Sequence, residues 1–298
     1  MFADVVNTAP RMLLRADDES YPKAVLEAYD KPPELHVLGN PLVAERPCIS
    51  IIGARKATPY GLAAAMLAGR VAAECGIVVV SGGARGCDFA AAKAALDAGG
   101  TTIVVPGCGA DHVYPASSVE VFEGALRSGG CIMSLEAWGS EPRKHAFPKR
   151  NGIIAALGQS LLVAEAGLPS GTFSTASAAF DYGKDVYAIP GSIWSPTCKG
   201  TNLLIEQGAA IICDECALET RISLDYSLLR MRSPHAEKSH DELMAALIAS
   251  PMTPEHLAES LGIPVLELLR ELTTREAAGL VERLADGRYS PSVHALIG

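Results

Sequence analysis

Short apolar runs alternate with stretches of helical period along the first two-thirds of the chain, and most of these runs end at glycine. The runs are apolar throughout rather than at every second position, which is typical of strands covered on both faces. Helices between such strands make right-handed crossovers and place the strands parallel. The pattern predicts an α/β fold with an extended Rossmann-like, doubly wound and mostly parallel sheet. The strand runs are 48–53, 77–83, 101–107, 131–135, 160–166, 185–191 and 209–214; the helices are 60–75, 88–98, 119–127, 172–182 and 201–207, and a long polar loop follows 131–135.

A different pattern begins near residue 239. Three short helical stretches, two of them with proline at the start, are followed by two strand-like runs around the turn Asp286-Gly287. Three helices and a β-hairpin predict a small C-terminal winged-helix domain. The predicted division is a lead-in segment over 1–45 that covers a sheet edge, a Rossmann-like domain over 46–216, a linker over 217–238 and a winged helix over 239–298.

Composition supports a two-domain protein that needs no metal. A chain of 298 residues with 49% hydrophobic residues can bury one large core and still form a second, smaller domain. No apolar run reaches the roughly 18 residues of a membrane helix, and the N-terminus lacks a signal-peptide pattern, so we expect a cytoplasmic protein without membrane contact. The eight cysteines lie mostly in or beside apolar runs, and we expect them to be reduced. Cys213 and Cys216 form the one CxxC pair. Because no second pair of ligands accompanies it, we expect no zinc site.

One cationic stretch stands out against the acidic total. The formal net charge is -9 and the pI is near 5.3, which excludes a protein that coats nucleic acid with its whole surface. Residues 143–150 nevertheless hold four cations, with Phe147 between them. Positive charge attracts phosphate, and an aromatic ring can stack on a base that a single strand leaves exposed. The cations are Arg143, Lys144, Lys149 and Arg150.

Glycine-rich turns at predicted strand ends supply a second set of candidate residues. Ligands of doubly wound sheets bind beyond the carboxyl ends of the strands, where glycines let backbone N–H groups approach a phosphate at a helix start. Because GxGxxG is missing after the first strand and no GxxxxGK[ST] occurs, we expect neither a dinucleotide nor a P-loop nucleotide, and no cofactor. The candidate residues are Gly53, Arg55 and Lys56 after the first strand, Ser81, Gly82, Gly83, Arg85 and Gly86 after the second, and Ser170, Gly171 and Thr172 after the fifth.

Several motifs in the same order resemble the DNA-processing protein A family, also called DprA or Smf. They are SGGARGCD at 81–88, GCGADHVYP at 107–115, FPKRNGIIAALGQSLLVAEA at 147–166 and GTNLLIEQGA at 200–209. The resemblance implies a non-enzymatic protein that binds and protects single-stranded DNA and loads the recombinase RecA onto it in natural transformation and recombination. It also implies a homodimer formed through the Rossmann domain, and it makes the single-strand binding protein a possible partner.

The same resemblance assigns roles within the candidate site. The implied DNA contacts are the side chains of Arg55, Lys144 and Phe147 and the backbone of 82–86 and 170–172. Residues that line or support the pocket are Arg85, Lys149, Arg150 and Asn151. The chain departs from the family at Gly152, where an arginine is usual, so one cation of the rim or of the helix is missing.

Two other functions remain open on the sequence. A nucleotide N-glycoside hydrolase of the phosphoribohydrolase type uses a PGGxGTxxE loop, but the local PSGTFST places Thr175 where the glutamate is needed. Carboxylates that could substitute are Asp88, Asp111, Glu136 and Glu165. A duplex-binding regulator would work through the winged helix, yet the segment from Asp241 onward carries nine acidic residues against four arginines. Such a charge balance suits a protein partner better than phosphates.

Overall fold

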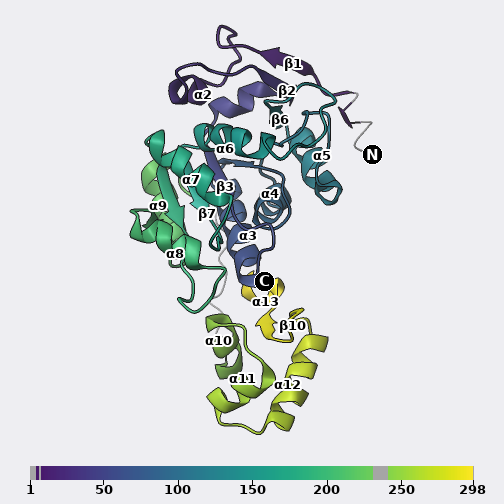
Figure 1. Cartoon of the computed structure of the whole chain (residues 1–298), viewed down its shortest axis with the longest axis vertical. Coiled ribbons are helices and arrows are strands. Elements are labelled where there is room, and N and C mark those ends of the chain that lie inside the picture. The colour runs from purple at the N-terminus through teal and green to yellow at the C-terminus, as the bar shows by residue number, and fades with distance from the viewer. Residues whose placement is uncertain (1–4, 7, 231–240, 298) are drawn as a thin grey trace.

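A nine-stranded sheet forms the centre of the computed structural model, which describes residues 5–6, 8–230 and 241–297 (Figure 1). The strand order is β1-β2-β6-β5-β4-β3-β7-β8-β9, and neighbouring strands from β6 to β9 are parallel. The mostly parallel α/β prediction is therefore confirmed. The strands are β1 Arg11–Leu14, β2 Leu35–Gly39, β3 Cys48–Ile52, β4 Val78–Ser81, β5 Thr102–Val104, β6 Cys131–Ser134, β7 Ser160–Val163, β8 Asp185–Ala188 and β9 Ala210–Ile211.

Two helical layers cover the sheet, because its strands are apolar on both faces. Ile49, Ile51 and Val79 pack with α3, α4 and α9, whereas Val78, Val80 and the helices α6 and α7 share the opposite core. None of the described helices is long and apolar enough to cross a membrane. The helices of this unit are α2 Lys23–Ala28, α3 Pro59–Glu74, α4 Cys87–Asp97, α5 Val119–Arg127, α6 Ala146–Leu157, α7 Thr172–Asp181, α8 Lys199–Glu206 and α9 Glu215–Tyr226, with 3-10 turns at Pro41–Glu45 and Ala116–Ser118.

Strands β1 and β2 of the N-terminal segment form part of the sheet, which the sequence pattern did not predict. β2 pairs antiparallel with β6, and β1 pairs antiparallel with β2. Leu35, Val37 and Leu38 are fully buried, so this proline-marked segment contributes core side chains as well as the edge strand β1 and its neighbour β2. The proposed domain division at residue 46 stays a prediction.

Two further segments differ from their predicted structure. The second half of the predicted polar loop is helix α6, whose residues Ile153–Leu157 are buried behind a cationic first turn. Helix α9 occupies the first part of the predicted linker over 217–238, because Leu218, Ile222 and Tyr226 are buried against the face that also carries α3. Residues 231–238 of that predicted linker lie outside the described residues.

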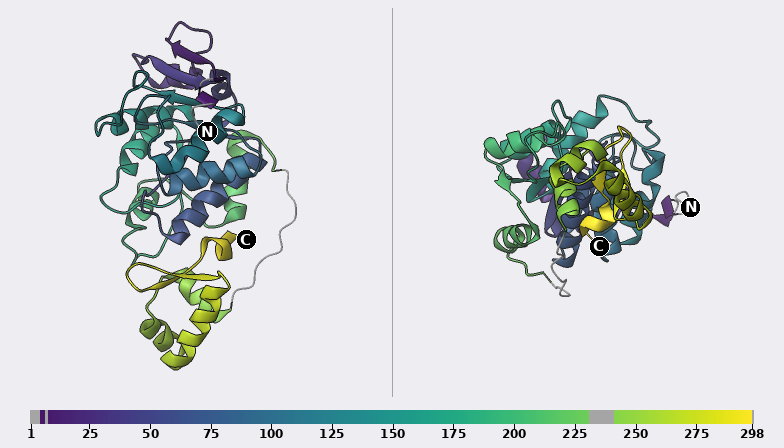
Figure 2. Two further views of the ribbon diagram at one scale, coloured as in Figure 1. Left: turned by 90° about the vertical axis from the view of Figure 1, so that its right-hand side faces the viewer. Right: turned by 90° about the horizontal axis from the view of Figure 1, so that it is seen from below.

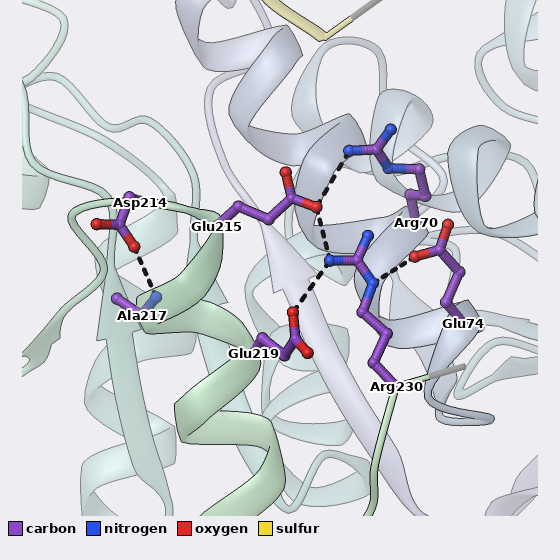
Figure 3. A network of polar contacts seen from close by, with 7 residues as sticks. All are labelled: Arg70, Glu74, Asp214, Glu215, Ala217, Glu219 and Arg230. Carbon is purple, nitrogen blue, oxygen red and sulfur yellow. Dashed lines mark hydrogen bonds and ion pairs between the residues drawn. The ribbon is translucent and has the colours of Figure 1, made fainter. Parts of the chain in front are cut away.

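A buried arginine fixes the chain where it leaves α9 (Figure 3). The side chain of Arg230 has no exposed surface, and its guanidinium pairs with Glu74 of α3 and with Glu215 and Glu219 of α9. Nη1 lies 2.6 Å from Glu215 and 3.4 Å from Glu219. Burial lowers the pKa of Arg230, but the carboxylates of Glu215 and Glu74 outweigh that effect and the net pKa is raised. The cation therefore joins α9 to α3.

The C-terminal residues form the predicted winged helix, with its own apolar core. It consists of α10 Glu242–Ala249, α11 Pro254–Leu261, α12 Val265–Ala277 and the hairpin β10 Val281–Arg283 and β11 Tyr289–Pro291. A last helix, α13 Val293–Ile297, was not predicted; it packs against α3 of the sheet unit (Figure 2). Leu296 and Ile297 line a hollow of about 230 Å³ together with Tyr60 and Leu67.

Candidate functional site

A hollow of about 530 Å³ lies at the carboxyl ends of β3 and β7. From this pair of strands the chain winds outward in opposite directions, through β4 on one side and β8 on the other, and such a switch point is where open α/β sheets bind ligands. The walls come from the turn after β3, the start of α6 and the loop between β7 and α7. They include Ile52–Lys56, Phe147, Arg150, Asn151 and Gly167–Thr172.

A second hollow of about 260 Å³ adjoins the first over β4. Arg55 and Phe147 line both hollows and so form their common border. The guanidinium carbon of Arg55 lies 4.8 Å from the ring centroid of Phe147, a cation–π arrangement. Arg55 is exposed and Phe147 is half-buried, so a cation and an aromatic ring are both accessible at this border. Residues that only the second hollow contains are Gly82, Arg85, Tyr114 and Pro115.

Neighbouring residues hold the Phe147 ring in place. A side chain at Gly107, which follows β5, would meet the ring at 2.8 Å. The ring therefore lies in the space that the glycine leaves open. The ring centroid of Tyr114 lies 5.9 Å from that of Phe147, and Tyr114 is 42% exposed. Tyr114 was not among the predicted site residues. Its only signal was its place in the GCGADHVYP motif, since its approach to Phe147 depends on packing between distant segments.

Arg150 is buried and packs against the turn after β4. Its Nη1 donates to the carbonyl of Val105 at 2.9 Å, and a side chain at Gly82 would meet that nitrogen at 1.6 Å. Burial lowers the pKa of Arg150, and the nearby carboxylate of Asp88 acts against that shift. Burial likewise raises the pKa of Asp88, which accepts the N–H of Gly82 at 3.1 Å. The pair therefore fixes the glycine turn from both sides.

Hydrogen bonds also fix the turns after β3 and β7. Thr58 donates its N–H and hydroxyl to the two carboxylate oxygens of Glu165, at 2.8 and 2.7 Å. The N–H of Thr172 is donated to Ser170 Oγ at 3.2 Å, which shapes the start of α7. Asn151 Nδ2 donates to Ser174 Oγ at 2.7 Å and so ties α6 to α7. Glu165 therefore has a structural task, and Thr175 at the wall of the first hollow carries no ionisable group.

Tyr29 limits the space beside Gly152. A side chain at this position would meet Tyr29 Oη at 2.2 Å, and Tyr29 also lies 5.6 Å from the ring of Tyr182. Tyrosine from the end of α2 thus fills the space that a side chain at 152 would need.

The structure places most predicted site residues in the two hollows but leaves five outside their walls. Ser81 is buried and donates its hydroxyl to Ile51 O at 2.8 Å, and Gly83 and Gly86 have φ of 64° and 80°, so these three shape the turn. Lys144 and Lys149 are exposed near the start of α6. The predicted residues that line a hollow are Gly53, Arg55, Lys56, Gly82, Arg85, Phe147, Arg150, Asn151, Ser170, Gly171 and Thr172.

Comparison with known proteins gives matches over both parts of the chain. Residues 12–221 match the family model of DNA recombination-mediator protein A, and residues 230–287 match the DprA winged helix domain. Protein Smf of Escherichia coli (strain K12) is 31% identical over 284 residues, covering 92% of this chain and 76% of that protein. DNA processing protein DprA of Streptococcus pneumoniae is 37% identical over 197 residues, covering 65% of this chain and 68% of that protein.

Two solved structures are similar as well. DNA processing protein A from Streptococcus pneumoniae has a TM-score of 0.65 at 33% identity and covers 72% of this chain and 75% of its own. DNA processing protein A from Helicobacter pylori, whose structure is described by its single-stranded DNA binding mode, has a TM-score of 0.63 at 29% identity. That match covers 72% of this chain and 97% of the other.

Proposed function

The chain belongs to the DNA recombination-mediator protein A family, and on that premise we propose that it binds single-stranded DNA at the two hollows of its sheet. The observation that carries the proposal is the border shared by both hollows, where Arg55 lies over the ring of Phe147. The Helicobacter pylori relative, described by its single-stranded DNA binding mode, supports the same assignment. The protein would then act in DNA processing as a cytoplasmic binder rather than as an enzyme.

Each part of the border has a role in binding a single strand. Arg55, Lys56, Arg85 and exposed Lys144 neutralise successive phosphates, and backbone N–H groups of the turns after β4 and β7, other than those of Gly82 and Thr172, donate hydrogen bonds to them. Phe147 and Tyr114 offer ring faces to the bases, which duplex DNA keeps stacked inside. Arg150 and Asn151 act from behind by fixing the turns. Affinity should therefore depend little on sequence and strongly on salt.

A salt titration tests this mechanism. Each neutralised phosphate of a single strand contributes a slope of about 0.7 in log K against log salt, so three or four contacts give about 2 to 3. The measurement is fluorescence anisotropy of a labelled oligonucleotide at several salt concentrations. Phe147→Leu serves as the matched control, because loss of stacking weakens binding without changing the slope. A slope near zero would contradict phosphate binding.

We further propose that this protein passes the bound strand to RecA during recombination and transformation. In doing so it displaces the single-strand binding protein from the strand. The family's description as a recombination mediator supports this role. The expected result is faster RecA filament formation on a strand precoated with single-strand binding protein. The rate of ATP hydrolysis by RecA measures how fast the filament forms. Arg55→Glu should remove the acceleration. An unchanged filament rate with the wild type would end the loader proposal and leave DNA binding intact.

The proposed assembly is a homodimer formed by the sheet unit. β9 is the last strand of the sheet, and its Ile211 is 48% exposed. Phe180 on α7 of the same half of the sheet is 39% exposed. Exposed apolar side chains at one end of a sheet are typical of a surface that packs against a second copy. These residues support an interface apart from the two hollows.

A hydrolase of the phosphoribohydrolase type is the weaker candidate. The required glutamate is replaced by Thr175, which is 2% exposed. Among the carboxylates that could substitute, Glu165 is bonded to Thr58 and Asp88 to the N–H of Gly82. Asp111 accepts the N–H of Gly139 at 2.8 Å. These partners favour binding over acid–base chemistry at this edge of the sheet.

A further inference from the structure

The loop between β8 and α8 carries two large apolar side chains in solvent. Ile193 is 73% exposed and Trp194 is 85% exposed. A single exposed apolar residue is ordinary, but two adjacent ones that include a tryptophan are a costly feature for a surface loop. The loop is therefore a candidate binding element.

Hydrogen bonds hold this loop in a defined conformation. The N–H of Gly191 is donated to Asn202 Oδ1 at 3.1 Å, and Asn202 Nδ2 donates to Gly191 O at 3.0 Å. Tyr60 donates its hydroxyl to Pro190 O at 2.6 Å, and the N–H of Ser195 closes a turn onto Ser192 O at 2.9 Å. The tip with Trp194 is thus held by bonds on both sides. Ordering it on binding costs little, because the fold has already fixed it.

The loop lies on the same edge of the sheet as the two hollows. It follows β8, the neighbour of β7, and its residues Pro196 and Thr197 line the first hollow. Pro196 O would lie 3.1 Å from a side chain at Gly167, so the loop packs closely on the turn after β7. Lys199 is exposed at the first residue of α8. The loop and the start of α8 thus carry an aromatic ring and a cation.

We propose that Trp194 is a second stacking platform, which receives a nucleobase of a strand that leaves the first hollow across β7 toward β8. Lys199 binds a phosphate of the same segment. This inference rests on the proposed single-stranded DNA binding and extends it from the Arg55–Phe147 border to the loop after β8. The bound strand then follows the order β4, β3, β7, β8 along the carboxyl edge of the sheet.

The two tryptophans of the chain allow a direct test. Trp138 lies edge-on to His36, with centroids 5.4 Å apart, and Trp138→Phe leaves Trp194 as the sole tryptophan. This full-length variant is titrated with unlabelled oligothymidylates of about 4 to about 16 nucleotides. We expect the long strands to quench Trp194 emission. The shortest should bind at the Phe147 border and leave the emission unchanged.

Affinity measurements complete the test. Trp194→Ala should weaken binding of the long strand by about 5- to 150-fold, the range of base–aromatic stacking, and leave the shortest strand unaffected. Trp194→Phe retains a ring face and should restore most of the affinity. Circular dichroism and sedimentation are recorded for each variant to compare folding and assembly.

Three outcomes would overturn the inference. If Arg55→Glu weakens binding but Trp194→Ala does not, and emission is unchanged, the strand does not reach the loop and the proposed function stands. If Trp194→Ala alters sedimentation instead of DNA affinity, the tip docks a second copy of the chain. If neither Arg55→Glu nor Trp194→Ala changes DNA affinity, the proposed function itself has failed.

Discussion

Arg55→Glu should lower the affinity for a single-stranded oligonucleotide by about 100-fold, because a charge-assisted hydrogen bond is lost and a like charge faces the phosphates. The substitution also removes the cation from the face of Phe147, 4.8 Å away. Folding should be unaffected, since Arg55 is exposed. The measurement is fluorescence anisotropy at fixed salt, with circular dichroism of the unbound variant.

Arg221→Glu is the matched control for this substitution. Arg221 is exposed on α9, away from both hollows, and its reversal changes the net charge of the protein by the same amount. Its effect should be less than threefold, since exposed charges separated by more than a Debye length of about 8 Å are screened at physiological salt. Equal losses for the two variants would mean that the total charge, rather than the border of the hollows, determines binding.

Arg230→Met should lower the free energy of unfolding of the sheet unit by about 2 to 4 kcal/mol, since it removes the buried cation that joins three carboxylates, while Glu215 keeps its pair with Arg70 at 3.5 Å. Glu74, Glu215 and Glu219 would then face one another without the guanidinium between them (Figure 3). These carboxylates keep 23% to 30% of their side-chain surface exposed, which places the loss below that of a fully buried group. Urea unfolding followed by circular dichroism measures the change.

A second-site change separates charge from packing in this network. Glu74→Gln combined with Arg230→Met should recover part of the lost stability, because one of the three negative charges around the former cation is removed and the Arg70–Glu215 pair is kept. Arg221→Met on the same helix should leave the unfolding midpoint almost unchanged, as expected for an exposed side chain. A loss for Arg230→Met no larger than that for Arg221→Met would show that the network contributes nothing to stability.

The parallel part of the fold was predictable because its signal is local. Runs such as 48–53 and 77–83 are mostly apolar at consecutive positions and end in glycine. Each run therefore predicts a buried strand without information from the rest of the chain. β1 and β2 were missed because prolines flank these short strands and because antiparallel pairing of β2 with β6 joins segments far apart in the chain. Helix α6 was missed because its first turn is cationic and resembles a solvated loop.

The candidate site shows the same division between local and long-range information. Glycine turns and the cation-rich stretch can be recognised in the sequence, and the fold places Arg55 beside Phe147. The burial of Arg150, in contrast, depends on Gly82 and Val105, which directly follow β4 and β5. Tyr114 near Phe147 and Tyr29 against Gly152 are likewise products of packing. Side-chain partners of this kind have no period or spacing by which they could be predicted.

The most direct test of the account is a competition between single-stranded and duplex DNA for the wild-type protein. A labelled oligonucleotide bound at physiological salt is displaced by unlabelled single strand or by the same sequence as a duplex, and anisotropy is read for each. The account predicts that the single strand displaces the label at a concentration at least about 10-fold lower, since only its bases can stack on Phe147 and Tyr114. Equal displacement by the duplex would contradict it.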